Sequence, residues 1–305
     1  MIAPRVVESR VVEPRVIEPR VIERGDAAYP EAALRALRHP PERLYALGEP
    51  AALDGAPERL VAIVGTRDAS PYGIRVATEL GRAFAAAGIG VVSGLARGID
   101  SAAHRAALEA GGWTIAVLGT GVDVPYPVAH RALHARLAAD GLVLSENEPG
   151  TPAAPGCFPR RNRIIAALAK VTIVVEAPYK SGAVNTASQA FALCRTVAAV
   201  PGPIDSPRSA GSNQLLRDSA HVIATVDDAL GFYGVSRNRT GARPELGNLE
   251  AQIWDVLAAG SATPDVLGER AGLSVRQVLE GVARLEVCGL VQQGAGGEVE
   301  RVAIG

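Results

Sequence analysis

Hydrophobic and polar positions follow two patterns that alternate along the middle of the chain. Short runs of apolar, mostly β-branched residues are separated by Ala-rich stretches whose apolar positions recur every three or four residues. The short runs predict strands, and the longer stretches predict helices. Alternating strands and helices, with strands apolar on both faces, are typical of an α/β fold with a doubly wound parallel sheet. The predicted strands are Leu60–Gly65, Gly90–Gly94, Trp113–Gly119, Leu142–Glu146, Val171–Ala177, Val197–Gly202 and His221–Thr225.

The N-terminal residues depart from this pattern. Residues 5–24 are four pentads, RVVES, RVVEP, RVIEP and RVIER. Proline in the two middle units opposes a continuous helix, and the repeated charges oppose burial. We therefore expect residues 1–28 to be a low-complexity segment, extended or disordered, and residues 29–235 to form the Rossmann-like domain with a short lead-in.

The C-terminal residues predict a second, small domain. Residues 236–247, rich in polar residues with Gly and Pro, indicate a linker. Residues 248–305 show three amphipathic helical patterns and then a hairpin, which is typical of a winged helix-turn-helix. From Gly247 onward this part carries eight Asp and Glu but only four Arg. Because duplex DNA attracts cationic surfaces, we expect weak duplex binding at most, and a role in protein contacts or regulation.

The residues that follow the strands are candidates for binding, because ligands of open α/β sheets lie beyond the carboxyl ends of the strands. Two such turns, Gly65–Gly73 and Ser93–Asp100, combine glycines with a helix start and contain Arg67 and Arg97. Free backbone N–H groups at a helix start favour an anion. The alternative is that these glycines serve only tight packing.

The stretch FPRRNRII, Phe158–Ile165, concentrates three arginines where a helix is expected to begin. Cations at that end oppose the helix dipole, so a bound anion is the favoured explanation and a solvated basic turn is the alternative. Phe158 is either a stacking platform for a base or a hydrophobic staple. A further cradle is predicted at Lys180, Ser181 and Gly182, before another Ala-rich helix.

Candidates for catalysis are weaker. His104 is expected to be a capping or packing histidine, and Asp100 with Ser101 is typical of a helix N-cap. No Ser, His and Asp form a nucleophile-elbow pattern, and no carboxylate cluster predicts a metal site. The sequence contains neither GxxxxGK[ST] nor GxGxxG after the first strand, so neither a P-loop nor a dinucleotide cofactor is expected.

Composition limits the kinds of partner, covalent link and cellular location that are expected. The formal net charge is −1, so any attraction for a polyanion must come from a local patch. Cys157, Cys194 and Cys288 are widely spaced and predict neither a disulfide framework nor a zinc site. No apolar run reaches the roughly 18 residues of a membrane span, and the first residues lack the apolar core of a signal peptide. We expect a cytoplasmic protein.

Six blocks together resemble the DNA-processing protein A (Smf) family: VAIVGTRDASPYG, VVSGLARGIDSAAH, TIAVLGTGVDVPYP, FPRRNRIIAALA, VVEAPYKSG and AVPGPID. The resemblance spans about residues 29–230. It implies an extended Rossmann fold that binds single-stranded DNA and loads a RecA-type recombinase during natural transformation or repair. It implies no catalytic turnover and no cofactor.

The resemblance also implies which residues contact DNA and which mediate a homodimer. The dimer residues would be Leu215 and Leu216, which are ordinary core residues in the alternative interpretation. Many members carry a helical SAM-like domain before the sheet, where this sequence has the pentad repeat and a short segment, and Asn185 stands where an apolar residue is common. The DNA-binding residues would be Gly65, Thr66, Arg67, Ser93, Gly94, Gly98, Phe158, Arg160, Asn162, Arg163, Lys180, Ser181 and Gly182.

Two other functions are considered. A Rossmann-fold nucleotide phosphoribohydrolase is expected to show PGGxGT and a following glutamate, and SGAVNTASQ offers neither. A regulator that reads duplex DNA through the winged helix is disfavoured by the acidity of that domain.

Overall fold

The protein is described here by a computed structural model, which covers residues 18–235, 246–288, 290–294 and 296–301. The chain divides into two compact units, residues 1–236 and residues 237–305. Most of the N-terminal repeat and the predicted linker lie outside the described residues, so the expectations for them stay predictions.

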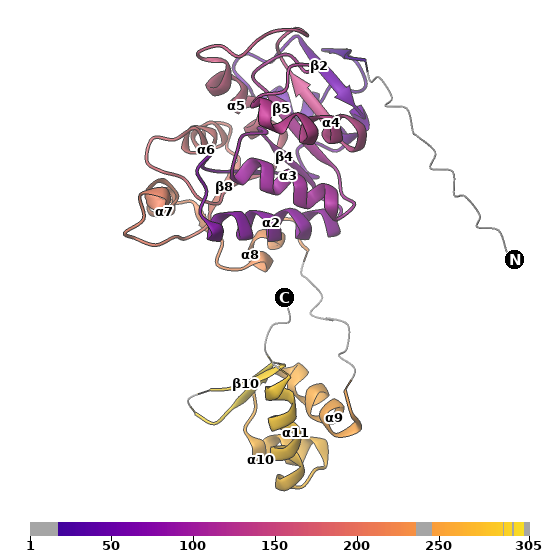
Figure 1. The fold of residues 1–305 in the computed structure, drawn as a ribbon, viewed down its shortest axis with the longest axis vertical. Helices are drawn as coiled ribbons and strands as arrows, with labels where there is room; N and C mark the ends of the chain where they lie inside the picture. The colour runs from indigo at the N-terminus through magenta and orange to yellow at the C-terminus, as the bar shows by residue number, and fades with distance from the viewer. Residues whose placement is uncertain (1–17, 236–245, 289, 295, 302–305) are drawn as a thin grey trace, which may run out of the picture. The chain divides into compact units, whose positions relative to one another are not determined.

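The first unit is built on one nine-stranded sheet with the order β1-β2-β6-β5-β4-β3-β7-β8-β9 (Figure 1). All seven strands predicted from the sequence are present and are parallel to one another. The strands are β1 (Arg20–Glu23), β2 (Arg43–Gly48), β3 (Leu60–Val64), β4 (Gly90–Ser93), β5 (Thr114–Leu118), β6 (Leu142–Ser145), β7 (Val171–Val174), β8 (Thr196–Ala199) and β9 (His221–Val222).

Helices cover both faces of the sheet, which confirms the doubly wound α/β fold. Helices α2, α3, α4 and α8 pack on one face, and α1, α5, α6 and α7 pack on the other. Their bounds are α1 (Glu31–Leu34), α2 (Pro71–Ala86), α3 (Ile99–Glu109), α4 (Arg131–Asp140), α5 (Cys157–Leu168), α6 (Gly182–Ala192), α7 (Ala210–Arg217) and α8 (Val226–Gly231). Short 3-10 helices lie at Pro50–Leu53, Val128–His130 and Pro207–Ser209.

Two strands were not predicted, and they correct the expected purely parallel sheet. β2 pairs antiparallel with β6, and β1 pairs antiparallel with β2. β1 belongs to the last pentad, so this part of the segment is extended, one of the two states expected, but the expected start of the domain at residue 29 is wrong because β1 already pairs with β2. Its charges do not prevent pairing, because Ile22 alone is buried while Arg20 and Glu23 point to solvent at the edge of the sheet.

The order of the strands places the candidate site. The chain runs from β3 through β4 and β5 to β6 on one side, and then crosses to β7, β8 and β9 on the other. The crevice of such a sheet opens beyond the carboxyl ends of the strands near this reversal. The turns after β3, β4 and β5 and the start of α5 therefore surround one region.

The second unit contains three helices and a two-stranded hairpin around its own apolar core, which confirms the winged helix. Its elements are α9 (Asn248–Val256), a 3-10 turn (Leu257–Ala259), α10 (Pro264–Ala271), α11 (Val275–Val287), β10 (Val291–Gln293) and β11 (Val299–Arg301). In neither unit does the described part contain a helix that is long and apolar enough to cross a membrane.

Candidate nucleic-acid interface

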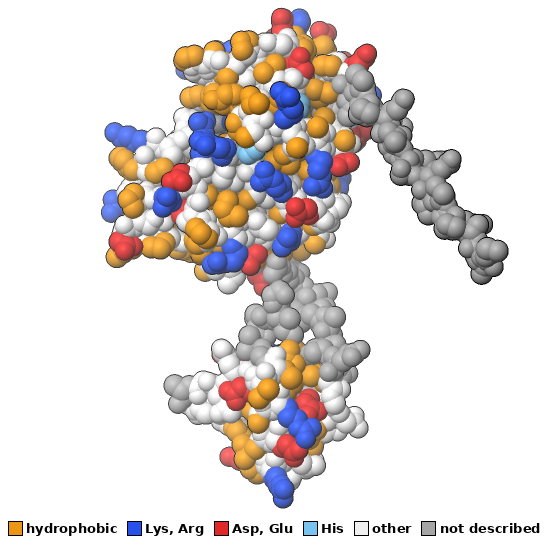
Figure 2. All heavy atoms as spheres, viewed as in Figure 1, with side chains coloured by type: hydrophobic (Ala, Val, Ile, Leu, Met, Phe, Trp, Pro, Cys, Tyr) orange, Lys and Arg blue, Asp and Glu red, His pale blue; other side chains and the backbone are white. Residues whose placement is uncertain are grey.

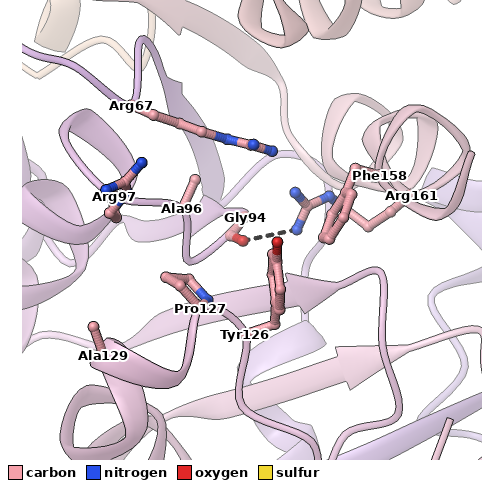
Figure 3. Close-up of a pocket in the computed structure, with 9 residues that line it drawn as sticks. All are labelled: Arg67, Gly94, Ala96, Arg97, Tyr126, Pro127, Ala129, Phe158 and Arg161. Carbon is pink, nitrogen blue, oxygen red and sulfur yellow. Dashed lines mark hydrogen bonds between the residues drawn. The ribbon is translucent and has the colours of Figure 1, made fainter. Parts of the chain in front are cut away.

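A cavity of about 240 Å³ lies at the carboxyl edge of β3, β4 and β5. Its walls combine arginines, two aromatic rings and small apolar residues, and the side chains converge on the opening (Figure 3). Cations beside aromatic rings are the groups that hold the backbone and stack the bases of a single strand. The lining residues are Arg67, Gly94, Ala96, Arg97, Tyr126, Pro127, Ala129, Phe158 and Arg161.

Arg67 and Arg97 are the exposed cations of this cavity. Both are solvent-exposed, and neither has a carboxylate within ion-pair distance in the described part of the chain. The Arg67 guanidinium lies 5.6 Å from the centre of the Phe158 ring. These two arginines are free to meet an anion without breaking an existing ion pair.

Tyr126 and Phe158 form the aromatic wall. Their ring centres are 5.1 Å apart, their planes are tilted by 32°, and Tyr126 is 40% exposed. An exposed ring stabilised by a second ring presents a flat π surface, which is what a nucleobase stacks on. Phe158 therefore lies where a stacking platform is needed, and Tyr126 joins it.

Arg161 is the buried floor of the cavity. It is 7% exposed, and its Nη1 donates to the backbone oxygens of Gly94, at 2.9 Å, and of Val117. Burial lowers the pKa of Arg161 to about 10, while the nearby Asp100 carboxylate opposes that shift and Arg67 adds to it. The side chain is still cationic at neutral pH, and it holds the turn after β4 by its carbonyl.

Asp100 holds the same turn by accepting hydrogen bonds from backbone N–H groups of the turn. Its Oδ2 accepts from Gly94 N at 3.1 Å and from Ala96 N at 3.4 Å. Burial raises the pKa of Asp100, and Arg161 opposes that rise. The turn after β4 therefore does not offer the free N–H groups that we expected, because an internal carboxylate already accepts from them.

The turn after β3 is occupied in the same way. Ser70 N donates to Glu176 Oε2 at 2.8 Å, and Ser70 Oγ caps α2 by accepting from Gly73 N. Thr66 is 8% exposed and Gly65 packs against Ile99, so only Arg67 of this predicted trio reaches the cavity.

Ser93 and Gly98 support the turn after β4 from outside the cavity. Ser93 is fully buried and donates through Oγ to Ile63 O at 2.6 Å. Gly98 has φ 76°, and a Cβ there would collide with Thr66 O. Both positions are structural in this geometry, and of the three residues predicted here to bind DNA, Ser93, Gly94 and Gly98, only Gly94 lines the cavity.

The start of α5 differs from the expectation. The helix begins at Cys157, so the arginines lie in its second turn instead of at its first N–H groups. Arg160 Nε lies 3.1 Å from Glu146 Oε2, and Arg163 Nη2 lies 2.5 Å from Glu146 Oε1. The basic crowding at FPRRNR is therefore partly neutralised within the protein.

Asn162 links α5 to α6. It is 6% exposed, and its Nδ2 donates to Gly182 O at 3.2 Å and to Asn185 Oδ1 at 3.1 Å. This contact explains why Asn185 fits where an apolar residue is common: it partners a buried amide.

The predicted cradle at the start of α6 lies apart from the cavity lining. Ser181 caps α6 by accepting from Val184 N at 3.3 Å, and Gly182 is open to solvent. Lys180 is exposed, with its Nζ 5.6 Å from the Tyr179 ring centre. These groups are accessible but belong to a neighbouring part of the sheet edge.

His104 is a packing histidine, as expected. It is fully buried, and its Nδ1 lies 2.7 Å from Thr114 Oγ1, which itself donates to Val91 O. Burial lowers the pKa of His104 to about 3. The imidazole is therefore neutral at physiological pH, and His104 itself does not line the cavity.

Leu215 and Leu216, the predicted dimer residues, are not exposed as a simple dimer contact would require. Leu215 is 5% exposed and belongs to the core, and Leu216 is partly buried against it. Beside them is a separate groove of about 250 Å³, where Tyr179 is 64% and Phe191 40% exposed. We call it the α6–α7 groove; its lining is Tyr179, Val184, Ser188, Phe191, Gly211, Gln214, Leu215 and Asp218.

The sequence did not single out Tyr126, Arg161 and Glu146 as site residues. Tyr126 lies in the loop after β5, within the block TIAVLGTGVDVPYP, from which no DNA-binding residue was predicted. Arg161 was one of three neighbouring arginines, and helical periodicity separates it: Arg161, Ile164, Ile165 and Leu168 share the buried face of α5.

Two family models match the chain. The family described as DNA recombination-mediator protein A matches residues 20–234, and the DprA winged helix domain matches residues 237–297. The first match begins at β1, in agreement with the strand found in the last pentad.

Individual relatives cover most of the chain. A putative DNA processing protein DprA of Mycobacterium tuberculosis is 45% identical over 276 residues, which is 87% of this chain and 71% of the relative. The protein Smf of Escherichia coli is 36% identical over 86% of this chain and 74% of its own length.

Two solved structures share the fold. DNA processing protein A of Streptococcus pneumoniae matches with a TM-score of 0.66 and 37% identity, over 72% of this chain and 75% of that chain. DNA processing protein A of Helicobacter pylori, whose structure is described as showing a single-stranded DNA binding mode, matches with a TM-score of 0.64 and 31% identity. That match covers 71% of this chain and 95% of the other.

Proposed function

Since this chain belongs to the DNA recombination-mediator protein A family, we propose that it binds single-stranded DNA at the cavity beneath Tyr126 and Phe158 and loads a RecA-type recombinase onto it. The observation that carries the proposal is that two arginines without an ion pair in the described residues surround one opening together with exposed Tyr126 and half-buried Phe158. Single-strand binding needs these two kinds of group together.

In this mechanism the exposed arginines hold phosphates and the aromatic rings take a base. Arg67 and Arg97 approach the opening from the turns after β3 and β4, so they flank the rings. Phosphate contacts carry no base information, and stacking tolerates any base. We expect affinity that depends strongly on salt and little on sequence.

The other residues predicted to contact DNA have different roles in this proposal. Gly65, Thr66, Ser93, Gly94 and Gly98 shape the turns that carry the arginines. Lys180, Ser181 and Gly182 extend the track along the sheet edge towards α6. Asn162 fixes α5 against α6, and Arg160 and Arg163 form a secondary cationic group shared with Glu146.

We propose that the chain forms a homodimer through the α6–α7 groove. Tyr179 and Phe191 are large, exposed and apolar, and the groove between the two helices accepts such side chains. Two linked strand sites raise the effective affinity for a long strand.

We propose no catalytic step, and we place the protein in the cytoplasm. The acids beside the turns, Asp100 and Glu176, already accept hydrogen bonds from backbone N–H groups. Within the described residues no group of three or more His, Cys, Asp or Glu is arranged to hold a metal ion. Incubation with nucleoside monophosphates tests this: release of base at enzymic rates would favour the phosphoribohydrolase alternative.

The direct test of binding compares a labelled oligo-dT with a duplex of the same length at physiological salt. We expect fluorescence anisotropy to show clear preference for the single strand. Equal affinity for both forms would contradict the proposal, because a stacking site needs unpaired bases.

A further inference from the structure

Glu146 lies between two arginines of α5 and neutralises part of their charge. It directly follows β6, and its side chain is only 15% exposed. Each carboxylate oxygen has its own partner: Oε2 meets Arg160 Nε at 3.1 Å, and Oε1 meets Arg163 Nη2 at 2.5 Å. Two oxygens held by two guanidinium groups are the arrangement that a phosphodiester would otherwise adopt.

The carboxylate is held in this place by its own loop. Asn147 Nδ2 donates to Gly119 O at 2.8 Å, and Asn147 N donates to Ser145 Oγ at 3.0 Å. These bonds fix the end of β6 beside the end of β5. Glu146 is thus positioned by the fold and does not depend on its arginine partners alone.

The two arginines differ in accessibility. The Arg160 side chain is 60% exposed, whereas that of Arg163 is 17% exposed. Arg160 is also on the helix that brings Phe158 and Arg161 to the cavity. Of the pair, Arg160 is therefore the residue that a strand leaving the cavity can reach.

We propose that Glu146 is an affinity-determining residue, an internal competitor that restrains Arg160 and weakens the hold on single-stranded DNA. This inference rests on the proposed function. With Glu146 charged, the cluster carries one net positive charge; with a neutral residue there it carries two. A protein that must hand its strand to a recombinase gains from a binding site that does not hold it too tightly.

The test substitutes Glu146→Gln, which keeps the shape and one acceptor but removes the charge. We expect anisotropy with labelled oligo-dT to show binding on the order of three- to tenfold tighter. We also expect a log–log salt slope steeper by up to about 0.7, the contribution of one more phosphate contact on a single strand. Glu148→Gln is the matched control, because it makes the same charge change at an exposed neighbour outside any ion pair recorded in the described residues.

A double-mutant cycle with Arg160→Met locates the effect. If Glu146 acts by restraining Arg160, the gain from Glu146→Gln disappears when Arg160 is absent. An equal gain in Glu148→Gln, a gain that persists with Arg160→Met, or no gain at all would overturn the inference. If Glu146→Gln is not folded, as shown by the absence of a cooperative unfolding transition, Glu146→Asp replaces it. The shorter side chain draws the carboxylate back from Arg160, and its affinity for oligo-dT is compared with that of the wild type in the same way.

The outcome is separable from that of the proposed function. If the wild-type protein binds no single strand, the proposed function fails. If it binds and Glu146→Gln binds equally well, only the competitor role of Glu146 fails.

Discussion

Buried charges near the cavity are tied to the backbone turns that carry its exposed arginines. Arg161 donates to the carbonyl of Gly94 while Asp100 accepts from its N–H, so the polar groups of one residue are held by opposite charges. Arg161 and Asp100 thereby position Arg97, three residues after Gly94. These two buried residues shape the site, whereas the exposed Arg97 is free to bind.

Arg161→Met should destabilise the fold strongly, because it leaves Asp100 buried without its cation. Its guanidinium also donates to the buried oxygens of Gly94 and Val117, and the loss of a charged donor to a buried acceptor typically costs about 1.5–3 kcal/mol of unfolding free energy. Urea denaturation measures this, with Arg160→Met as the exposed control at less than about 1 kcal/mol. Similar midpoints for both variants would contradict the role given to Arg161.

His104 should make stability depend on pH below neutrality. Its pKa is about 3 in the folded protein, well below the ordinary value of 6.5. As the pH falls below 6.5, the imidazole is therefore protonated in the unfolded chain while it is still neutral in the folded protein. The stabilising contribution is complete above pH 6.5 and falls as pH decreases towards 3, by about 2 kcal/mol between pH 7 and pH 5.

The control for His104 is His104→Asn, which keeps a donor for Thr114 but gains no proton. Urea denaturation at pH 7 and pH 5 should show a smaller pH effect in this variant. The same loss in both proteins would show that other groups cause it.

The stacking wall predicts a second class of effect. Tyr126→Leu and Phe158→Leu should each weaken oligo-dT binding by about 1–2 kcal/mol, since each removes a π surface and keeps an apolar side chain. Anisotropy measures the affinity, and Tyr72→Leu, an aromatic on α2 outside the cavity lining, is the control. An unchanged affinity in both cavity variants would remove stacking from the mechanism.

At the scale of elements, six of the seven parallel strands, β3 to β8, were predictable because their apolar runs are continuous and almost wholly buried. β9 was also predicted from its apolar run, but it is exposed at the edge of the sheet. β1 was missed because its edge position allows charges and a mixed pattern, and it buries only Ile22. β2 lies between β1 and β6, and it was missed because its buried run is only four residues long, Leu44–Leu47, directly after charged residues. The arginines of the turns were found from sequence. The ion pairs of the α5 arginines were not predictable, because Glu146 is brought to Arg160 and Arg163 only by the tertiary fold.

Helix α11 occupies the place of a DNA-reading helix, but its outer face argues against that use. Val275, Leu279 and Val287 are 54%, 52% and 89% exposed, and Figure 2 shows hydrophobic side chains on the surface of this unit. Arg284 is paired with both Glu250 and Glu280. Of the two arginines of α11, only Arg276 is left without an ion pair among the described residues, and a largely apolar exposed face suits a protein contact better than a phosphate backbone.

The isolated fragment of residues 247–305 should therefore bind duplex DNA weakly. It has its own apolar core, so it is expected to fold alone. Anisotropy with a labelled duplex at physiological salt checks this. Micromolar or tighter binding would contradict it and would revive the duplex-reading alternative.

At the scale of the whole molecule, the proposed dimer predicts a concentration-dependent mass. Phe191→Asp places a charge in the α6–α7 groove at an exposed position, so the monomer should remain folded. In sedimentation, this variant should have half the mass of the wild-type dimer. Phe191→Leu is the apolar control. A monomeric wild type, or a Phe191→Asp dimer, would contradict the groove as the interface.

The nearly neutral chain binds a polyanion, in this account, through a few arginines that the fold leaves without partners. Many other exposed arginines, such as Arg82 and Arg136, face a carboxylate on their own surface. On the face shown in Figure 2, basic side chains of the first unit are dispersed among acidic, neutral and apolar ones. Net charge is therefore a poor guide to this site. A missing ion pair is not sufficient either, since exposed Arg35, Arg38 and Arg105 also have none among the described residues; the site is marked by arginines that share one cavity with two aromatic rings.

The most direct test is a salt titration of oligo-dT binding for the wild type, Arg67→Met/Arg97→Met and the charge-matched control Arg82→Met/Arg136→Met. The account predicts that loss of Arg67 and Arg97 makes the log–log slope shallower by about 1.4, or about 0.7 for each phosphate contact, while the control keeps the wild-type slope. An unchanged slope in Arg67→Met/Arg97→Met, or an equal change in both double variants, would contradict it.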